Sequence, residues 1–84
     1  MYSTYILQNT VSRRFYIGST NNLERRISEH NRGQTRSTRQ KGIWELKYKE
    51  KFLTSLEAKR REFKIKSYKG GEAFKKLFAV VVQR

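Results

Sequence analysis

The absence of cysteine most limits how a chain of 84 residues can fold. Neither a disulfide framework nor a thiolate zinc site is available to supplement a small core. A domain of this size buries only about 60 to 65% of the surface that its unfolded chain exposes. Packing of side chains must therefore hold the fold, and we expect residues 1–84 to form a single domain compatible with a reducing cytosol.

Basic residues dominate the charge of the chain. Twenty Lys and Arg stand against seven Asp and Glu, which gives a formal net charge of +13. This charge far exceeds what solubility requires and indicates a polyanionic partner. Nucleic acid fits better than a membrane surface, because the basic residues are spread along the whole chain. A merely supercharged surface is the alternative.

The N-terminal sequence shows no sign of export or membrane insertion. No apolar run approaches the roughly 20 residues that a membrane span needs. The first ten residues, MYSTYILQNT, lack the charged start and the long apolar region of a signal peptide. We therefore expect a soluble protein of the cytoplasm.

Two short runs near the N-terminus have the composition of β-strands. Residues 2–7 (YSTYIL) and 14–18 (RFYIG) are rich in aromatic and β-branched side chains, which predicts a β-hairpin. Alternation puts Tyr5 on one face of the first strand and Tyr16 on one face of the second. Whether the two tyrosines share a face depends on the register.

A helix is predicted immediately after this hairpin. Asn21 and Glu24 resemble a capping box that opens it. Four side chains then follow at i, i+3, i+4 and i+7, namely Leu23, Arg26, Ile27 and His30. This spacing places them on one face of the helix, so Arg26 and His30 should border the core, whereas Arg25 should not.

A polar loop and a third strand come next. Residues 31–42 have no apolar side chain and several basic ones, which indicates an exposed loop able to contact a phosphate backbone. Three apolar residues then alternate with charged ones, namely Trp44, Leu46 and Tyr48. Residues 43–52 therefore predict a strand with one buried face.

Two further helices are expected in the C-terminal half. Thr54 begins a cap for a highly charged helix that runs from about Ser55 to Ser67. Gly70 and Gly71 should break that helix. The spacing of Phe74, Leu77, Phe78 and Val81 predicts a last amphipathic helix, although three consecutive valines at 80–82 leave a strand open.

Together these side chains suggest phosphodiester chemistry. Hydrolysis needs an oriented, deprotonated water and a cation against the charge on the phosphoryl oxygens, and an arginine such as Arg26 suits the second role. A lone carboxylate such as Glu62 can hold one hydrated Mg²⁺. A tyrosine is a poor base at its free pKa of about 10, but nearby cations favour the phenolate.

Each of these residues also has an ordinary structural interpretation. Arg26 can extend over the core, His30 can be a hydrogen-bonded edge residue, and the tyrosines can simply pack in the sheet. Glu62 can form an i,i+4 ion pair with Lys66. Three other glutamates are equally eligible metal ligands by pattern alone, namely Glu45, Glu57 and Glu72.

The arrangement of these motifs resembles the GIY-YIG nuclease family. The resemblance rests on YIL at 5–7, YIG at 16–18, NLERRISEHN at 22–31 and AKRREFKIKSYKGGEAF at 58–74, with the two tyrosines eleven positions apart. It is strongest to small single-domain members similar to the N-terminal nuclease domain of excinuclease. Ser3 and Thr4 stand where the family pattern has Gly-Ile, and the asparagine that some members carry after the glutamate has no counterpart.

The resemblance implies a fold and a set of site residues. The fold is α+β, a small three-stranded antiparallel sheet flanked by helices. The implied catalytic residues are Tyr5, Tyr16, Arg26, His30 and Glu62. Glu62 would hold one divalent ion, Mg²⁺ or Mn²⁺, while Arg26 would stabilise the phosphate. One tyrosine would activate water, with Tyr5 preferred, and Tyr16 and His30 would orient the water or assist proton transfer.

The resemblance also implies the partner of the chain. DNA is the expected substrate, with contacts expected from Gly18, whose missing side chain admits a close approach, and from the loop residues Arg36, Arg39 and Lys41. Larger family members carry a separate DNA-binding domain that supplies target choice, so this chain would be weakly specific, selective for DNA structure, or dependent on a partner protein or domain. The predicted function is divalent-metal-dependent endonuclease activity on DNA, in repair, recombination or processing of nucleic acid.

Two other interpretations remain open from the sequence. The first is a non-catalytic, basic nucleic-acid-binding module on the same fold, based on the loop at 31–42 and the lysine-rich segment at 59–69. The second is a protein-interaction domain with an acidic partner, which is less favoured because the pattern suggests little exposed apolar surface.

Overall fold

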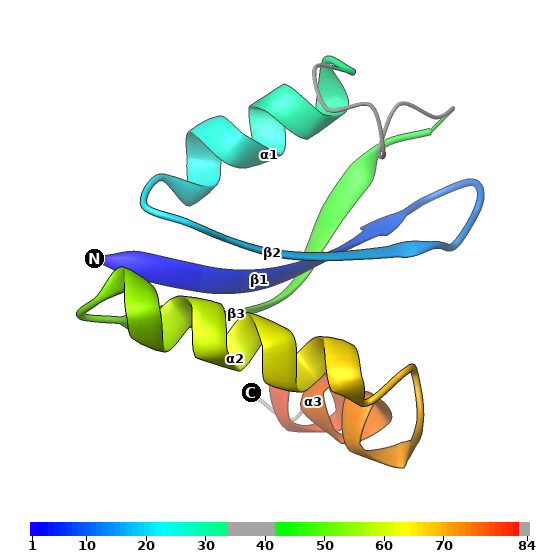
Figure 1. Ribbon diagram of the computed structural model, residues 1–84. Coiled ribbons are helices and arrows are strands. Elements are labelled where there is room, and N and C mark those ends of the chain that lie inside the picture. Colours follow the sequence, from blue (N-terminus) through cyan, green and yellow to red (C-terminus); the bar gives the residue numbers. More distant parts are fainter. Residues whose placement is uncertain (34–41, 83–84) are drawn as a thin grey trace.

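The computed structural model describes residues 1–33 and 42–82, with the backbone alone for residues 78–82. Its elements, in chain order, are β1 (Tyr2–Asn9), β2 (Phe15–Thr20), α1 (Leu23–Asn31), β3 (Trp44–Phe52), α2 (Ser55–Ser67) and α3 (Glu72–Val82). The strands form an antiparallel sheet in the order β2-β1-β3, with helices on both faces (Figure 1). The predicted α+β fold is thereby confirmed.

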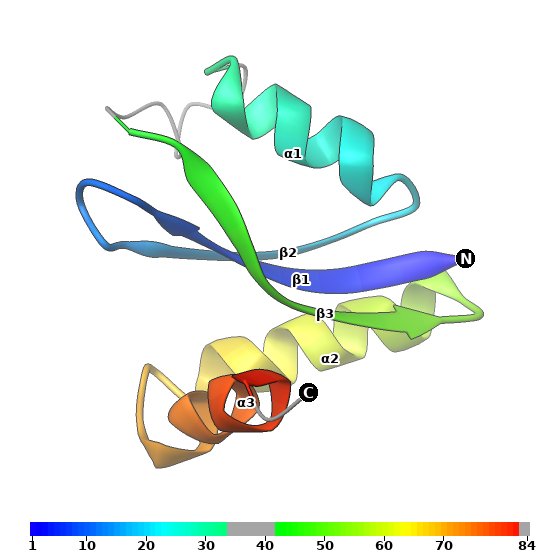
Figure 2. The same ribbon diagram turned by 180° about the vertical axis from the view of Figure 1, so that it is seen from behind.

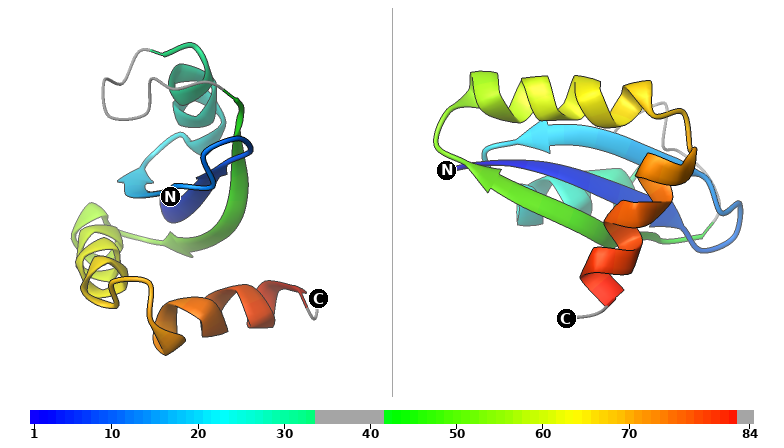
Figure 3. Two further views of the ribbon diagram at one scale, coloured as in Figure 1. Left: turned by 90° about the vertical axis from the view of Figure 1, so that its right-hand side faces the viewer. Right: turned by 90° about the horizontal axis from the view of Figure 1, so that it is seen from below.

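The sheet separates two small apolar cores. Helix α1 covers one face, and α2 and α3 cover the other, as the views from behind and from the side show (Figures 2 and 3). Under α1 lie Tyr5, Leu7 and Trp44, with Tyr16, Leu23 and Ile27 packed against them. Under α2 and α3 lie Ile6, Ile65 and Phe74, with Ile17, Tyr48, Tyr68 and Leu77 packed against them. Because β1 is the central strand, its alternate side chains supply both cores.

Helix α1 begins one residue later than the sequence pattern predicted. Its N-cap is Asn22, whose side-chain oxygen accepts a hydrogen bond from the backbone N–H of Arg25 at 3.1 Å. The capping box assigned to Asn21 is therefore wrong by one position. The inward face is as predicted, because Leu23 and Ile27 pack against the core and His30 is buried.

A β-bulge in the third strand changes which side chains share a face. Leu7 of β1 pairs with Leu46, but its neighbour Ile6 pairs with Tyr48, so Lys47 is the extra residue. The extra residue reverses the alternation, and Trp44 consequently packs under α1 while Tyr48 packs under α2 and α3. The prediction of one buried face for this strand was wrong.

Helix α2 is held against the sheet at its N-terminal end. Its N-cap Thr54 accepts from the backbone N–H of Glu57 at 3.2 Å, as the sequence predicted. Further along, the buried hydroxyl of Thr4 donates to the backbone oxygen of Ala58 at 2.7 Å. This hydrogen bond fixes α2 to the central strand and so positions the side chains that α2 presents to β2.

The last segment is a helix rather than a strand. Gly70, with φ of 74°, lies between α2 and α3 in a conformation that few other residues adopt. Phe74 and Leu77 face the sheet as expected, while the side chains of Phe78 and Val81 lie outside the described residues. Within residues 1–33 and 42–82, no helix is long and apolar enough to cross a membrane.

Candidate active site

The two tyrosines lie side by side on the face of the sheet covered by α1. In the hairpin, Tyr5 pairs with Gly18 and Leu7 pairs with Tyr16, and paired residues of antiparallel strands point to the same face. The ring centroids of Tyr5 and Tyr16 are 6.3 Å apart. The register, which the sequence left open, therefore brings the tyrosines together.

His30 reaches both tyrosines from the inner face of α1. Its Nε2 lies 3.1 Å from the hydroxyl of Tyr5, and its ring centroid lies 4.5 Å from that of Tyr16. Burial lowers the pKa of His30 from 6.5 to about 4, and the positive charge of Arg26 adds to the decrease. The imidazole is therefore neutral at pH 7, and it is a weaker base than a free histidine.

Tyr5 is more strongly protonated than the sequence suggested. Burial raises its pKa to about 12, with further increases from the neighbouring Tyr16 and from the carboxylate of Glu62, while Arg26 acts in the opposite direction. We expected nearby cations to favour the phenolate, and this expectation was wrong because desolvation outweighs the effect of Arg26. In the protein without substrate, Tyr5 keeps its proton at neutral pH.

Arg26 lies at the rim of this cluster, and Arg25 lies outside it. The Arg26 side chain is 32% exposed and that of Arg25 is 62% exposed. Nη1 of Arg26 is 2.9 Å from Oε1 of Glu29, and this contact is the main reason why the pKa of Arg26 is raised; interactions with Tyr5 and Tyr16 add to it. The guanidinium thus stands beside both tyrosines with Glu29 as its present counterion.

Glu62 approaches from the other face of the sheet. Its Oε1 accepts a hydrogen bond from the hydroxyl of Ser19 at 2.8 Å, and its Oε2 lies 2.7 Å from Nζ of Lys66. Its side chain is only 13% exposed. The ion pair expected from the helical spacing is present, but the contact with Ser19 was missed, because no local pattern links residues 43 positions apart.

Gly18 lies where the two halves of the cluster meet. A Cβ atom at this position would be 2.7 Å from the Tyr5 hydroxyl oxygen and 3.1 Å from Cε1 of Tyr16. Tyr5 therefore occupies the space that the absent side chain leaves. Ser19, the next residue on the edge strand β2, points to the opposite face and contacts Glu62. The candidate site thus straddles one short stretch of β2.

The donor atoms near β2 fit one hydrated divalent ion. The described residues contain no group of three His, Cys, Asp or Glu side chains able to hold a metal. Glu62 and Ser19 supply hard oxygen donors, and Mg²⁺ accepts such a sparse set because it keeps several of its waters. Binding through both carboxylate oxygens would require Lys66 to leave Glu62.

The structure separates the remaining candidates that the sequence could not rank. Glu57 belongs to the cap of α2, where its carboxylate accepts from the Thr54 hydroxyl at 3.1 Å. Glu45 lies on β3, where it forms an ion pair with Lys47 at 3.7 Å. Three loop residues predicted to contact nucleic acid lie outside the described residues: Arg36, Arg39 and Lys41.

The site has a tyrosine pair, a histidine and an arginine on one side of a glycine-bearing edge strand, and a glutamate on the other side. The chain that carries this arrangement can be compared with known proteins. The family model described as the GIY-YIG catalytic domain matches residues 1–75. The chain belongs to the GIY-YIG family. This family is of the nuclease type, which agrees with the class of chemistry predicted from the sequence.

Two similar proteins place this GIY-YIG domain among small members of the family. It is 42% identical to the UPF0213 protein OB0043 of Oceanobacillus iheyensis over 52 residues. The aligned residues make up 61% of this chain and 60% of the relative. The match therefore spans less than two thirds of that relative. The solution NMR structure of the UPF0213 protein BH0048 from Bacillus halodurans is 28% identical, with a TM-score of 0.54, and the superposition covers 96% of this chain and 85% of the other.

Proposed function

We propose that this GIY-YIG domain is a divalent-metal-dependent endonuclease that hydrolyses phosphodiester bonds in DNA, with residues 1–84 acting as one nuclease domain. One observation carries the proposal: side chains of four elements meet at Gly18 and Ser19 of the edge strand β2. Tyr5, His30 and Arg26 come from the α1 side, and Glu62 comes from the α2 side. A phosphate at this edge would meet both groups.

Arg26 and Glu62 would bind the phosphate from its two sides. A Mg²⁺ or Mn²⁺ ion held by Glu62 would supply Lewis-acid stabilisation of the phosphoryl oxygens. The Arg26 guanidinium would exchange its present partner Glu29 for the phosphate, because its planar fork suits two oxygens at once. Both interactions strengthen as negative charge develops on the phosphate, and this is the condition for catalysis rather than mere binding.

The Tyr5–His30 pair would remove the proton from the attacking water. Tyr5 keeps its own proton in the free protein, so it would pass that proton to Nε2 of His30 while it accepts one from water. Nε2 can take this proton when the other nitrogen of the neutral imidazole carries the hydrogen. The pKa of His30 is lowered in the free protein, so the transfer would need the negative charge of a bound phosphate, which offsets Arg26 and favours the imidazolium. Tyr16 is half-buried and contacts His30, which suits it to orient the water.

Nicking of supercoiled plasmid at low salt, with Mg²⁺ or Mn²⁺, tests the proposal. Glu62→Gln should abolish nicking. Glu57→Gln makes the same change on the same helix, but at the cap rather than beside β2, and should leave nicking unchanged. Equal nicking by both variants would mean that Glu62 has no role and would overturn the proposal.

A non-catalytic nucleic-acid-binding module is the second candidate. It is favoured by the contact between Lys66 and Glu62, which occupies one carboxylate oxygen, and by the absence, among the described residues, of a group of three side chains able to hold a metal. Salt-sensitive DNA binding without nicking in either metal would establish this alternative.

The biological setting belongs to the same proposal. Repair, recombination or processing of nucleic acid in the cytoplasm would suit a small basic nuclease. A partner protein or domain would choose the target, since the net charge of +13 attracts nucleic acid without regard to sequence.

A further inference from the structure

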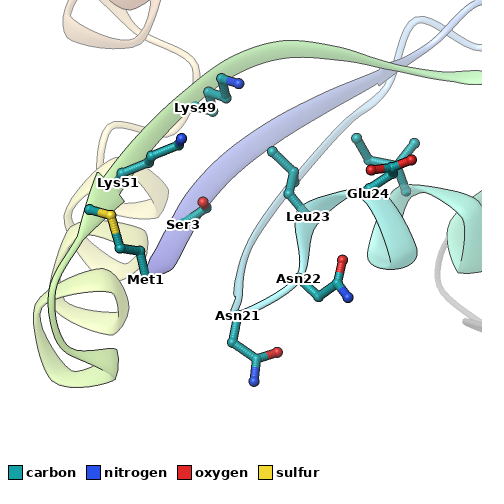
Figure 4. Close-up of a pocket in the computed structure, with 9 residues that line it drawn as sticks. Met1, Ser3, Asn21, Asn22, Leu23, Glu24, Lys49 and Lys51 are labelled. Atoms are coloured by element: carbon teal, nitrogen blue, oxygen red, sulfur yellow. The ribbon is translucent and has the colours of Figure 1, made fainter.

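A groove lies beside the candidate active site, between the sheet and the beginning of α1 (Figure 4). Its volume is about 500 Å³. The floor is formed by β1 and β3, where Ser3 pairs with Lys51 and Tyr5 pairs with Lys49. Ser3 and Tyr5 are alternate residues of β1, so the groove and the tyrosine cluster share one face of the sheet, roughly 7 Å apart along the strand.

Ser3 places a hydroxyl without a partner in this groove. The residue is only 8% exposed, yet its side chain makes no hydrogen bond to any described residue. The hydroxyl oxygen itself is not one of the described buried atoms that lack a partner, so it is open to the groove and able to bond to a ligand there. Ser3 also stands where the family pattern has glycine, so this hydroxyl is a feature of the present chain.

The charges around the groove favour an anion. Lys49 and Lys51 extend along one side and form no ion pair within the described part of the chain (Figure 4). Opposite them lies the N-terminus of α1, where the backbone N–H groups of Leu23 and Glu24 have no hydrogen-bond partner among the described residues. Such N–H groups and the helix dipole attract negative charge. The carboxylate of Glu24 is exposed and opposes only part of this positive field.

We infer that this groove binds a backbone phosphate of the nucleic acid strand, next to the phosphate at the cleavage site. The phosphate would accept hydrogen bonds from the Ser3 hydroxyl and from the N–H groups of Leu23 and Glu24, with Lys49 and Lys51 as counterions. The inference rests on the proposed function, because it names a second contact for the same substrate. Its effect would be to fix the direction in which the strand crosses β2.

DNA binding in the absence of metal tests the groove separately from catalysis. Fluorescence anisotropy would measure the affinity for a labelled duplex, about two helical turns long, over a range of KCl concentrations. The double variant Lys49→Gln/Lys51→Gln removes two charges from the groove. The matched double variant Lys75→Gln/Lys76→Gln removes two charges from exposed positions on α3, which covers the opposite face of the sheet.

The groove variant should bind at least tenfold more weakly than the control variant. Its plot of log affinity against log salt should be shallower by about 0.9, since the groove binds one phosphate and each phosphate contact contributes about 0.9. Ser3→Ala should weaken binding less, and the amide signals of Leu23 and Glu24 should shift in NMR spectra when the duplex is added. Melting temperatures within a few degrees of the unmodified chain would show that the variants fold.

The possible results separate the groove from the nuclease. An equal loss of DNA affinity in the two double variants, or unshifted amide signals of Leu23 and Glu24, would overturn the proposed role of the groove even if the chain nicks plasmid. A loss of DNA affinity in the groove variant alone, together with no nicking by the unmodified chain, would support the proposed role of the groove and overturn the proposed nuclease activity. A chain that does not bind the duplex at all would overturn both.

Discussion

Two adjacent arginines in α1 have different surroundings, although the sequence makes them look equivalent. Arg26 stands beside Tyr5 and Tyr16, whereas Arg25 extends into solvent. Removal of a preorganised donor to the transition state costs about 10² to 10³ in rate. We therefore expect Arg26→Ala to reduce plasmid nicking by that amount. Arg25→Ala should reduce it by less than about fivefold, because an exposed charge contributes at most about 1 kcal/mol. Equal losses would contradict the assignment.

The buried imidazole of His30 should make the stability of the fold depend on pH. Its pKa is lowered from 6.5 to about 4, so between these values the unfolded chain binds a proton that the folded chain does not. Stability is therefore complete above pH 6.5 and is lost as the pH falls toward 4. The free energy of unfolding should decrease by about 2 kcal/mol between pH 7 and pH 5.

Urea denaturation of the unmodified chain and of His30→Gln, at pH 7 and pH 5, measures this effect. The variant lacks the titrating group but keeps a side chain that can hydrogen-bond to Tyr5, so its stability should change less between the two pH values. The same decrease in both proteins would mean that another group causes it.

At the scale of residues, the sequence predicted which side chains face the core better than it predicted their protonation and their contacts. The helical period was enough to separate Arg26 and His30 from Arg25, because facing the core depends on spacing. The protonation of Tyr5 could not be predicted in this way. Cations can be counted in a sequence, but the burial that outweighs them depends on three elements packing around one ring. The contact between Ser19 and Glu62 likewise exists only in the folded chain.

Among the elements, β3 shows most clearly where periodicity fails. Alternating apolar residues predicted the strand, and the strand is present at Trp44–Phe52. A single extra residue at Lys47 then moves Tyr48 to the opposite face. A bulge leaves no mark on a pattern of alternating residues until the partner strand is known. Consequently the strand could be predicted, but its division between the two cores could not.

Helix α2 should depend on an ion pair that lies one residue away from Glu62. Nε and Nη2 of Arg61 lie 3.0 and 3.2 Å from the two carboxylate oxygens of Glu50, and the Tyr48 hydroxyl also donates to that carboxylate. The pair is half-buried and bidentate, unlike a typical surface ion pair. Glu50→Gln and Arg61→Gln should each lower the free energy of unfolding by about 1 to 2 kcal/mol.

A double-mutant cycle in urea measures the coupling within this pair. The double variant should lose less stability than the sum of the two single variants, with a coupling of at least about 0.5 kcal/mol. The ion pair between Glu45 and Lys47 on β3 is more exposed, with 3.7 Å between its charged atoms, and it serves as the control. Its coupling should be close to zero. A zero coupling for Glu50 and Arg61 would show that the interaction between these two side chains does not stabilise the fold.

For the whole molecule, the net charge of +13 should control how tightly nucleic acid is bound. Each phosphate contact releases counterions from DNA, so affinity falls steeply as salt rises. With six or more contacts, affinity should fall by roughly 10³ or more between 50 and 200 mM salt. Anisotropy with a labelled duplex, without metal, measures this. Affinity that is unchanged over this range would exclude a mainly electrostatic mode of binding and would also favour a protein partner.

The position of Gly18 and Ser19 on the edge strand of the sheet exposes the molecule to aggregation, apart from any role in catalysis. The outer N–H and C=O groups of an edge strand can pair with a strand of another chain, and sheets grow into aggregates in this way. Covering β2 would prevent such growth, but it would also block the approach to the tyrosines and to Glu62. Mutual repulsion between copies of a strongly cationic protein offers protection without a cover. The charge that draws a polyanion toward β2 therefore also keeps a second copy of the chain away from it.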